Sequence, residues 1–411
     1  MTKMKLVERH IIKKSHKYYN ELDHICFLSK NLYNSTLYTV RQYYFKNHKY
    51  LNYYEVNKQF TQDKQIDYCA LPRKVSKLVQ QLVDKNFKSF FSLLKLTKTK
   101  KYNKPIHIPK YLDKVKGRQI TTYTHQAISF KHKGYIRLSG TDVEIKSDKQ
   151  NIKFVRIVPK NGYIVVEVGY ELEPLSIIPD NNRYASIDLG INNLATITSN
   201  VHNPIIINGK PLKSINQYYN KQIAYYKSIL QIINNQFTSN KLKSLGRIRD
   251  NKINDYMHKA SHFIVNHLVS NKINTLIIGY NEGWKQDTNI GKVNNQKFVQ
   301  IPFLKFVWML EYKCKLVGIN VIRQEESYTS KCSFINRDYI PTYSVDDNLF
   351  NPSGKRVYRG LYKNNNGIYM NADVNGSYNI LRKYLTTNVA WNESLFSDHV
   401  EVCSTPLVKT F

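Results

Sequence analysis

The spacing of apolar residues changes twice along this chain of 411 residues, and each change marks a different kind of structure. In 73–95 apolar side chains recur every three to four residues, which predicts an amphipathic helix with a lysine-rich outer face. A weaker pattern of the same kind runs over 18–44. From about 112 to 174 the period becomes two, which predicts a small antiparallel β domain. These patterns indicate a multidomain protein rather than one repeated unit.

A third region begins near Asn181 and mixes short apolar strands with long helices. The first predicted elements are a strand at 184–190 and two short strands within 194–208. Helices at 214–237 and 241–269 come next, followed by a strand at 275–280, a helix at 298–318 and a strand at 319–325. This order is typical of an RNase H-like α/β fold that carries a helical insertion. The region has no glycine-rich phosphate-binding motif, so ATP or NAD dependence has no support.

The charge of the chain favours an acidic partner. Lys and Arg number 62 against 30 Asp and Glu, which gives a net charge of +32. Nucleic acid is the first candidate for such a protein. No stretch of about 18 apolar residues predicts a membrane span, the first residues do not resemble a secretory signal, and the five cysteines are scattered. We therefore expect a reduced, cytoplasmic protein, associated with the nucleoid if the source is bacterial.

Three carboxylates adjoin predicted elements of the third region. Asp188 ends the strand at 184–190, Glu282 lies two residues past the strand at 275–280, and Asp373 begins the last helical pattern. Strand ends in an open α/β sheet meet at one crevice, where binding sites usually lie. Each residue also has a simpler interpretation: a turn residue for Asp188, a lysine-paired loop carboxylate for Glu282, and a helix N-cap for Asp373.

The chemistry that would join these carboxylates is metal binding. An acid beside a nucleic-acid groove repels phosphate unless a cation neutralises it. Mg²⁺ prefers hard oxygen ligands, and phosphodiester hydrolysis can use two such ions about 3.5–4 Å apart. The sequence therefore predicts a magnesium site, provided that the fold brings the three side chains together.

Several longer motifs carry a family resemblance. SIDLGINNLAT, IIGYNEGWKQ, NQKFVQIPF, SYTSKCSF and MNADVNGSYNILRK, in this order, resemble the TnpB (OrfB) family of transposon-associated proteins from bacterial insertion sequences. The resemblance is dense over 180–385 and looser before it. It implies an RNA-guided DNA endonuclease related to the type V CRISPR effectors, which binds a noncoding guide RNA from the transposon end and cuts double-stranded DNA beside a short motif.

The resemblance also implies a domain plan, with a helical recognition lobe, an antiparallel β-barrel called the wedge, and an RNase H-like (RuvC) nuclease domain. We expect 1–12 as the first wedge strand, 13–104 as the recognition lobe, 105–178 as the wedge barrel, 179–326 and 367–390 as the two nuclease parts, 327–366 as a target-nucleic-acid-binding insertion, and 391–411 as a tail.

The resemblance to this family further implies that Asp188, Glu282 and Asp373 would be the catalytic triad that holds two Mg²⁺ ions, with Asp188 bridging both. Many relatives carry a zinc ribbon before the third carboxylate, but 327–370 contains one cysteine, Cys332, and no histidine. A structural zinc needs four such ligands. We therefore expect no zinc, an insertion held by Tyr and Phe packing, and a buried Cys332.

Contacts to nucleic acid are expected from basic residues of the helices and of the link after 95. The candidates are Lys77, Lys85, Lys88, Lys98, Lys100, Lys101, Arg247 and Arg249. We expect a monomer with no membrane partner. Two other functions stay open: a guide-independent transposase or resolvase, and a non-cleaving RNA-guided repressor. General RNase H activity on RNA–DNA hybrids is also compatible with the fold, because a fold does not fix a substrate.

Overall fold

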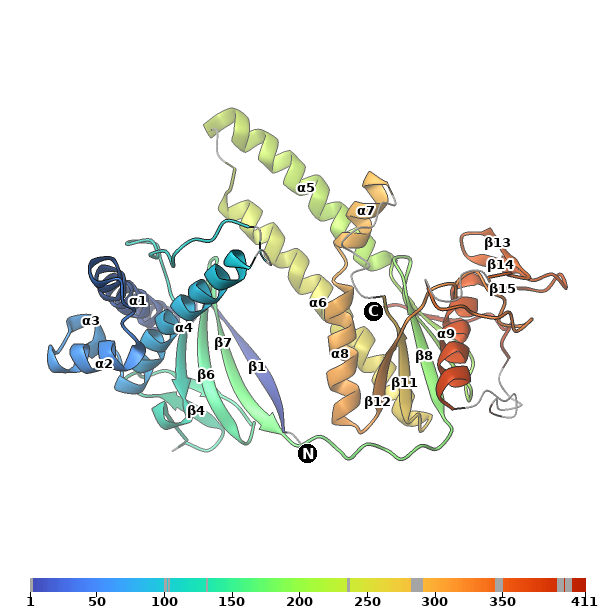
Figure 1. Cartoon of the computed structure of the whole chain (residues 1–411), viewed down its shortest axis with the longest axis horizontal. Helices are drawn as coiled ribbons and strands as arrows, with labels where there is room; N and C mark the ends of the chain where they lie inside the picture. Colours follow the sequence, from blue (N-terminus) through green and yellow to red (C-terminus); the bar gives the residue numbers. More distant parts are fainter. Residues whose placement is uncertain are drawn as a thin grey trace. The chain divides into compact units, whose positions relative to one another are not determined.

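The structure is a computed structural model. It describes residues 3–99, 102, 104–130, 132–234, 237–281, 291–343, 350–389, 395 and 401–411. The chain divides into two compact units, Met1–Glu173 and Pro174–Phe411, which Figure 1 draws in one view. Within the described ranges, no helix combines the length and apolar character needed to cross a bilayer.

The helical part of the first unit consists of α1 (Tyr19–Asn47), α2 (Tyr53–Gln62), α3 (Ile66–Cys69) and α4 (Arg73–Lys98). The helix predicted over 73–95 is confirmed by α4, which buries Val75, Val79, Val83 and Phe87 in a core shared with α1. Asn52 begins α2 with a capping box, because its side chain accepts from the Glu55 backbone while the Glu55 side chain accepts from the Asn52 backbone.

The β part of the first unit forms two antiparallel sheets. One has the order β1-β7-β6-β2, and the other has the order β3-β4-β5. The strands are β1 (Met4–Lys13), β2 (Thr121–Thr124), β3 (Ile128–Ser129), β4 (Tyr135–Leu138), β5 (Glu144–Lys146), β6 (Ile152–Lys160) and β7 (Tyr163–Leu172). Hydrogen bonds among the described residues close neither sheet into a ring. The wedge barrel therefore stays a prediction.

The second unit is built on a six-stranded sheet of order β12-β11-β8-β9-β10-β16. Its strands are β8 (Tyr184–Leu189), β9 (Asn193–Ser199), β10 (Ile205–Asn208), β11 (Thr275–Gly279), β12 (Asn320–Gln324) and β16 (Leu407–Lys409). β8, β9 and β10 form an antiparallel meander, whereas β11 runs parallel to both β8 and β12. The carboxyl ends of β8, β11 and β12 therefore meet at one edge of the sheet.

Helices cover both faces of this sheet, as Figure 1 shows for α6, α8 and α9. One face packs Ala185, Ile187 and Ile278 against α6 (Asn240–Ser270) and α8 (Phe303–Leu316). The alternate side chains Tyr184 and Ile277 pack against α9 (Ala372–Asn388) on the other face. α5 (Lys210–Asn234) forms a helical hairpin with α6, as the long helical patterns predict.

Two features differ from the sequence-based expectations. The helix expected over 298–318 is two helices, α7 (Lys292–Val299) and α8, because Pro302 interrupts the backbone and becomes the N-cap of α8. The tail, to which no pattern gave a role, adds β16 to the sheet by pairing parallel with β10. The Phe411 ring then packs against Tyr256 and Phe263.

The segment before α9 contains a small antiparallel sheet of β13 (Lys355–Tyr358), β14 (Leu361–Lys363) and β15 (Tyr369–Asn371). Phe334 stacks on Tyr378 with ring centroids 4.7 Å apart, in agreement with the predicted aromatic packing. Cys332 is fully buried, as predicted. Amide groups add to this packing, because the side chains of Asn375 and Asn379 donate to the Cys332 carbonyl at 2.8 and 2.7 Å.

Candidate active site

Asp188 and Asp373 are brought together by a close approach of α9 to β8. Asp188 lies near the carboxyl end of β8, and its side chain is directed toward α9. A Cβ added to Gly376 would lie only 2.9 Å from Asp188 Oδ2, so the glycine makes this approach possible. One turn earlier on the same helix face, Asp373 reaches the same site.

The simpler interpretation of Asp373, as a helix N-cap, is wrong. Asn371 is the N-cap, because its side chain accepts from the Asp373 and Val374 backbone amides at 2.9 and 3.1 Å. The carboxylate of Asp373 is therefore available for other contacts. It accepts from the Asn193 side chain at 2.7 Å and pairs with the Arg356 guanidinium at 3.3 Å.

Glu282 lies outside the described residues, so its part in the site stays a prediction. A different glutamate, Glu326, lines the same cavity as Asp188 and Asp373. It comes two residues after β12 and lies above the end of β11, where a Cβ on Gly279 would approach Glu326 Oε2 to 2.6 Å. Sequence reasoning missed Glu326, although the strand-end rule that selected Asp188 also applies to it.

The two glutamates that follow β12 have different environments. Glu325 pairs with Lys383 at 2.5 Å, and burial of that lysine makes this a structural ion pair. Glu326 faces the cavity, and its backbone amide donates to the Asn281 side chain at 3.2 Å. Glu326, not its neighbour, is therefore the carboxylate that can join the site.

The electrostatics of the site favour a bound cation. Burial raises the pKa of Asp188 well above its usual range, and the nearby Glu326 and Asp373 carboxylates raise it further. Burial, followed by the charge of Glu325, raises the pKa of Glu326 to about 7. Arg356 acts in the opposite direction on Asp188. Three clustered acids can remain ionised together only when positive charge compensates them.

The cavity between these residues has a volume of about 390 Å³. Its walls include Asp188, Asn193, Thr196, Glu326, Arg356 and Asp373. Among the described residues, Thr196 Oγ1 is buried without a hydrogen-bond partner. Carboxylate, amide and hydroxyl oxygens are the donors that Mg²⁺ prefers, so the residue types fit such an ion.

The fit is one of donor chemistry rather than of a preformed coordination shell. In the part of the chain that the structure describes, no group of three or more His, Cys, Asp or Glu side chains is arranged to hold a metal ion. The Arg356 guanidinium, which is paired with Asp373, supplies positive charge at this edge. Binding of an ion would therefore require Asp373 to exchange this partner for the ion.

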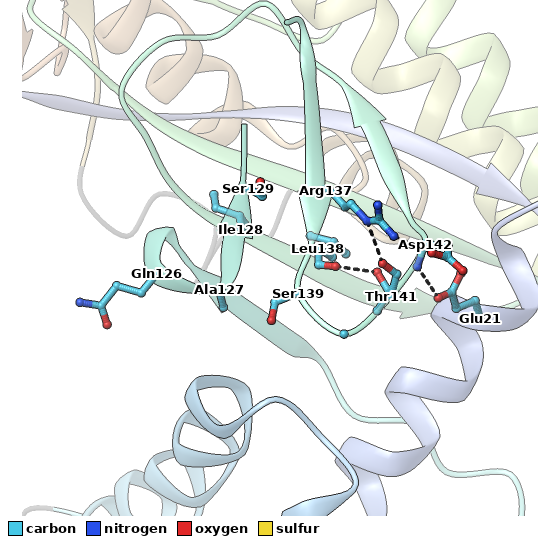
Figure 2. Close-up of a pocket in the computed structure, with 11 residues that line it drawn as sticks. Glu21, Gln126, Ala127, Ile128, Ser129, Arg137, Leu138, Ser139, Thr141 and Asp142 are labelled. Atoms are coloured by element: carbon cyan, nitrogen blue, oxygen red, sulfur yellow. Dashed lines mark hydrogen bonds and ion pairs between the residues drawn. The ribbon is translucent and has the colours of Figure 1, made fainter. Parts of the chain in front are cut away.

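A larger cavity, of about 620 Å³, lies in the first unit (Figure 2). Arg137 pairs with Asp142 at 2.6 Å, and Glu21 accepts from the Asp142 backbone at 3.0 Å. Among the described residues that line this cavity, the carboxylates are Glu21 and Asp142, so it has no cluster of three acids. We therefore place the candidate active site in the smaller cavity of the second unit.

The predicted phosphate contacts have varied surroundings. Lys85 and Lys98 are exposed on α4, and Lys77 is partly buried there. Lys88 is exposed but pairs with Asp84 at 2.8 Å. Lys100 and Lys101 lie outside the described residues.

The two arginines of α6 are both partly buried. The Arg249 guanidinium donates to Asn216 at 2.7 Å and to the Gln300 carbonyl at 3.1 Å, which favours a structural role for this residue. Arg247 is within 3.5 Å of Ser244.

Solved structures with some likeness to the chain include a complex of Cas12f1 with sgRNA and target DNA. That match has a TM-score of 0.35 and 14% identity, and it covers 91% of this chain and 98% of the other. The mini-RNA-guided endonuclease CRISPR-Cas_phi3 gives a TM-score of 0.44 and 10% identity, with 92% of each chain covered. Scores this low assign no role to any residue.

Sequence comparisons are more specific. The family model OrfB_IS605, described as "Probable transposase", matches residues 164–285, and the model of the Cas12f1-like TNB domain matches residues 303–380. The TnpB-like protein ORF457 of Acidianus two-tailed virus is 25% identical, over 88% of this chain and 83% of that protein.

The CRISPR-associated endodeoxyribonuclease Cas12f2 of the Micrarchaeota archaeon (strain CG1_02_47_40) is 27% identical over 56% of this chain and 42% of its own length. The two family models together match both parts of the chain that form the candidate site, since 164–285 contains Asp188 and 303–380 contains Glu326 and Asp373. In sequence, the chain is therefore similar to TnpB-like proteins and to the type V CRISPR effectors of the Cas12f kind.

Proposed function

We propose that this protein is an RNA-guided DNA endonuclease that hydrolyses phosphodiester bonds with divalent-metal chemistry. The observation that carries the proposal is the convergence of Asp188, Glu326 and Asp373 on one cavity at the carboxyl edge of the sheet. The relation to endonucleases of the Cas12f and TnpB kind supports this reaction class. The element order of the second unit is the one expected of an RNase H-like, RuvC-type domain.

Asp188, Asp373 and Glu326 are the residues that would hold the metal, and Glu282 is a further candidate ligand. Bound Mg²⁺ ions would supply the Lewis acidity and the activated water that phosphodiester hydrolysis needs. Asp188 is the central group, since both other carboxylates act on its charge. The side chain of Asn193 orients Asp373 by donating to it. Arg356, which is 37% exposed, offers a guanidinium that can attract phosphate to the site.

The proposed partners are a guide RNA and a double-stranded DNA target. The net charge of +32 suits two polyanions, and the Cas12f1 structure named above contains both sgRNA and target DNA. We further propose that the guide derives from the transposon end and that the target lies beside a short motif. Residues 13–104 would form the recognition lobe, the β domain the wedge, and 327–366 an insertion that contacts the target strand without zinc.

The test is cleavage by protein purified together with its native RNA. Guide-matched duplex DNA should be cut in the presence of Mg²⁺, and cutting should stop after nuclease removal of the RNA and return when the RNA is added back. Cutting of the same site by RNA-free protein would indicate a guide-independent nuclease. Guided binding without cleavage, at any Mg²⁺ concentration, would indicate a repressor.

A further inference from the structure

An arginine–glutamate–arginine ladder crosses three strands of the first unit. The register pairs Arg9 of β1 with Glu167 of β7, and Glu167 with Arg156 of β6. The three side chains therefore lie side by side on one face of the sheet, because directly paired residues project to the same side.

One buried carboxylate holds both guanidiniums. Glu167 Oε1 accepts from Arg9 Nε at 3.2 Å, and Glu167 Oε2 accepts from Arg156 Nε at 2.8 Å and from Arg156 Nη2 at 2.5 Å. The Glu167 side chain is 9% exposed, whereas those of Arg9 and Arg156 are 65% and 42% exposed. The carboxylate is thus the hidden member, and the two cations face solvent.

The ladder leaves donors and charge unused. In the described parts of the chain, neither terminal amino group of Arg9 has a hydrogen-bond partner, and neither has Nη1 of Arg156. Two cations against one anion leave a net positive charge. The buried Glu167 carboxylate needs a cation to compensate its charge, but one guanidinium is sufficient for neutrality. A second anion would complete the arrangement.

The surrounding face suits a nucleic-acid strand. On the exposed side of β1, Val7 and Ile11 lie next to Arg9, and Lys5 and Lys13 lie beyond them, each roughly 13 Å from Arg9 along the strand. Phe154 lies over Gly169, where an added Cβ would approach its ring to 2.3 Å, and the Arg156 guanidinium is 5.8 Å from the ring centroid. Glu171, the other acid of β7 on this face, is paired with Lys153 at 3.4 Å.

We propose that Arg9 and Arg156 form a phosphate clamp for the backbone of a nucleic-acid strand, with Glu167 as the residue that positions both guanidiniums. The proposal rests on the proposed function only in taking nucleic acid as the partner. Guanidinium groups match phosphate geometry with paired donors, and prior orientation reduces the entropy lost on binding.

Equilibrium binding to an RNA–DNA hybrid of about 20 base pairs, at several KCl concentrations and without Mg²⁺, tests the clamp. Single-stranded RNA and duplex DNA of the same sequence serve as further probes. Arg9→Gln and Arg156→Gln should each weaken binding by about tenfold. Each should also reduce the magnitude of the slope of log binding constant against log KCl concentration by about one. A loss confined to the RNA-containing probes would assign the clamped strand to RNA.

Glu167→Gln is the decisive variant, because charge and geometry predict opposite results. Loss of a negative charge alone would tighten binding, whereas loss of the clamp geometry should weaken it severalfold. Glu173→Gln is the matched control, since Glu173 is 73% exposed and pairs with Lys3 at 3.1 Å. Arg9→Lys keeps the positive charge but loses the paired donors of the guanidinium group, so this variant should also bind more weakly.

Two outcomes would overturn the clamp: Glu167→Gln binding as tightly as the unmodified protein, or Arg9→Lys binding without loss. Thermal unfolding identifies any variant that fails to fold, and the exposed Arg9→Lys change keeps the test decisive in that case. Failure of the proposed function is separate. A protein whose hybrid binding depends on the clamp, but which never cuts guide-matched DNA, would keep the clamp and lose the nuclease.

Discussion

Replacement of Gly376 by alanine should impair catalysis more than folding. The added Cβ would lie 2.9 Å from Asp188 Oδ2, whereas ordinary contacts of a Cβ begin at about 3.4 Å. Asp188, α9 or both must then move by roughly 0.5–1 Å. Misplacement of about 1 Å at a reacting centre can cost 10²-fold in rate. We therefore expect cleavage to slow by about 10- to 100-fold.

The stability change should be small because two effects oppose each other. Overpacking costs about 1–3 kcal/mol, but alanine is favoured over glycine within a helix by about 1 kcal/mol. Single-turnover cleavage of guide-matched DNA at saturating protein measures the loss, and binding of the same DNA should change little.

Gly246→Ala is the matched control for this experiment. Gly246 lies within α6, and the nearest atom to its added Cβ, Tyr219 Oη, is 3.9 Å away. This variant should cut normally and unfold at the same or a higher temperature. Equal cleavage rates for Gly376→Ala and the unmodified protein would refute the inference that α9 positions Asp188.

Three further predictions concern single side chains. Glu326→Gln should lower Mg²⁺-dependent cleavage by at least about 10²-fold, with guided DNA binding intact; if only Glu282→Gln has this effect in parallel assays, Glu326 is not a ligand. Arg356→Ala should slow cleavage and raise the Mg²⁺ affinity of the free protein, because Asp373 then has no cation to release; unchanged affinity in a Mn²⁺ titration would contradict this. Burial lowers the pKa of His202 to about 4, so the unfolded chain binds more protons between about pH 6.5 and 4, and stability should fall by up to about 3 kcal/mol as pH drops through that range. Urea unfolding at pH 7 and pH 4.5 checks this, and His202→Asn should remove most of the difference.

The sequence predicted those parts of the site that follow from strand ends. Asp188 and Asp373 could be selected because one ends an apolar strand and the other begins a helical pattern. Their mutual approach depends on Gly376, and a glycine within a helix does not by itself reveal which side chain will occupy the space beside it. The N-cap interpretation of Asp373 failed because Asn371, two residues earlier, meets the same preference.

Glu326 was missed for a different reason. The motif around Glu282 carries the family resemblance and favours the end of β11, and Glu282 itself lies outside the described residues. Glu326 enters the cavity from the end of β12. Gly279 was the available signal, since a residue without a side chain at the end of a buried strand leaves room for a neighbour. β16 could not be predicted, because a strand of three residues carries too little periodicity.

The contacts of individual arginines could not be predicted from the sequence pattern. The place of Arg249 in a basic helix predicts a phosphate contact, and in the structure its guanidinium contacts Asn216 and Gln300. The sequence pattern does not connect Arg9 with Arg156, because their common partner joins them only through strand register. Basic composition predicts the class of partner, but the pairing of each cation decides which ones are available.

The most direct test of the account is the location of divalent ions in crystals soaked in Mn²⁺, read from anomalous scattering. The account predicts at least one ion bound by Asp188 together with Asp373 or Glu326, and release of Arg356 from Asp373. A guided, cleavage-competent protein whose Mn²⁺ ions contact none of these carboxylates would contradict it.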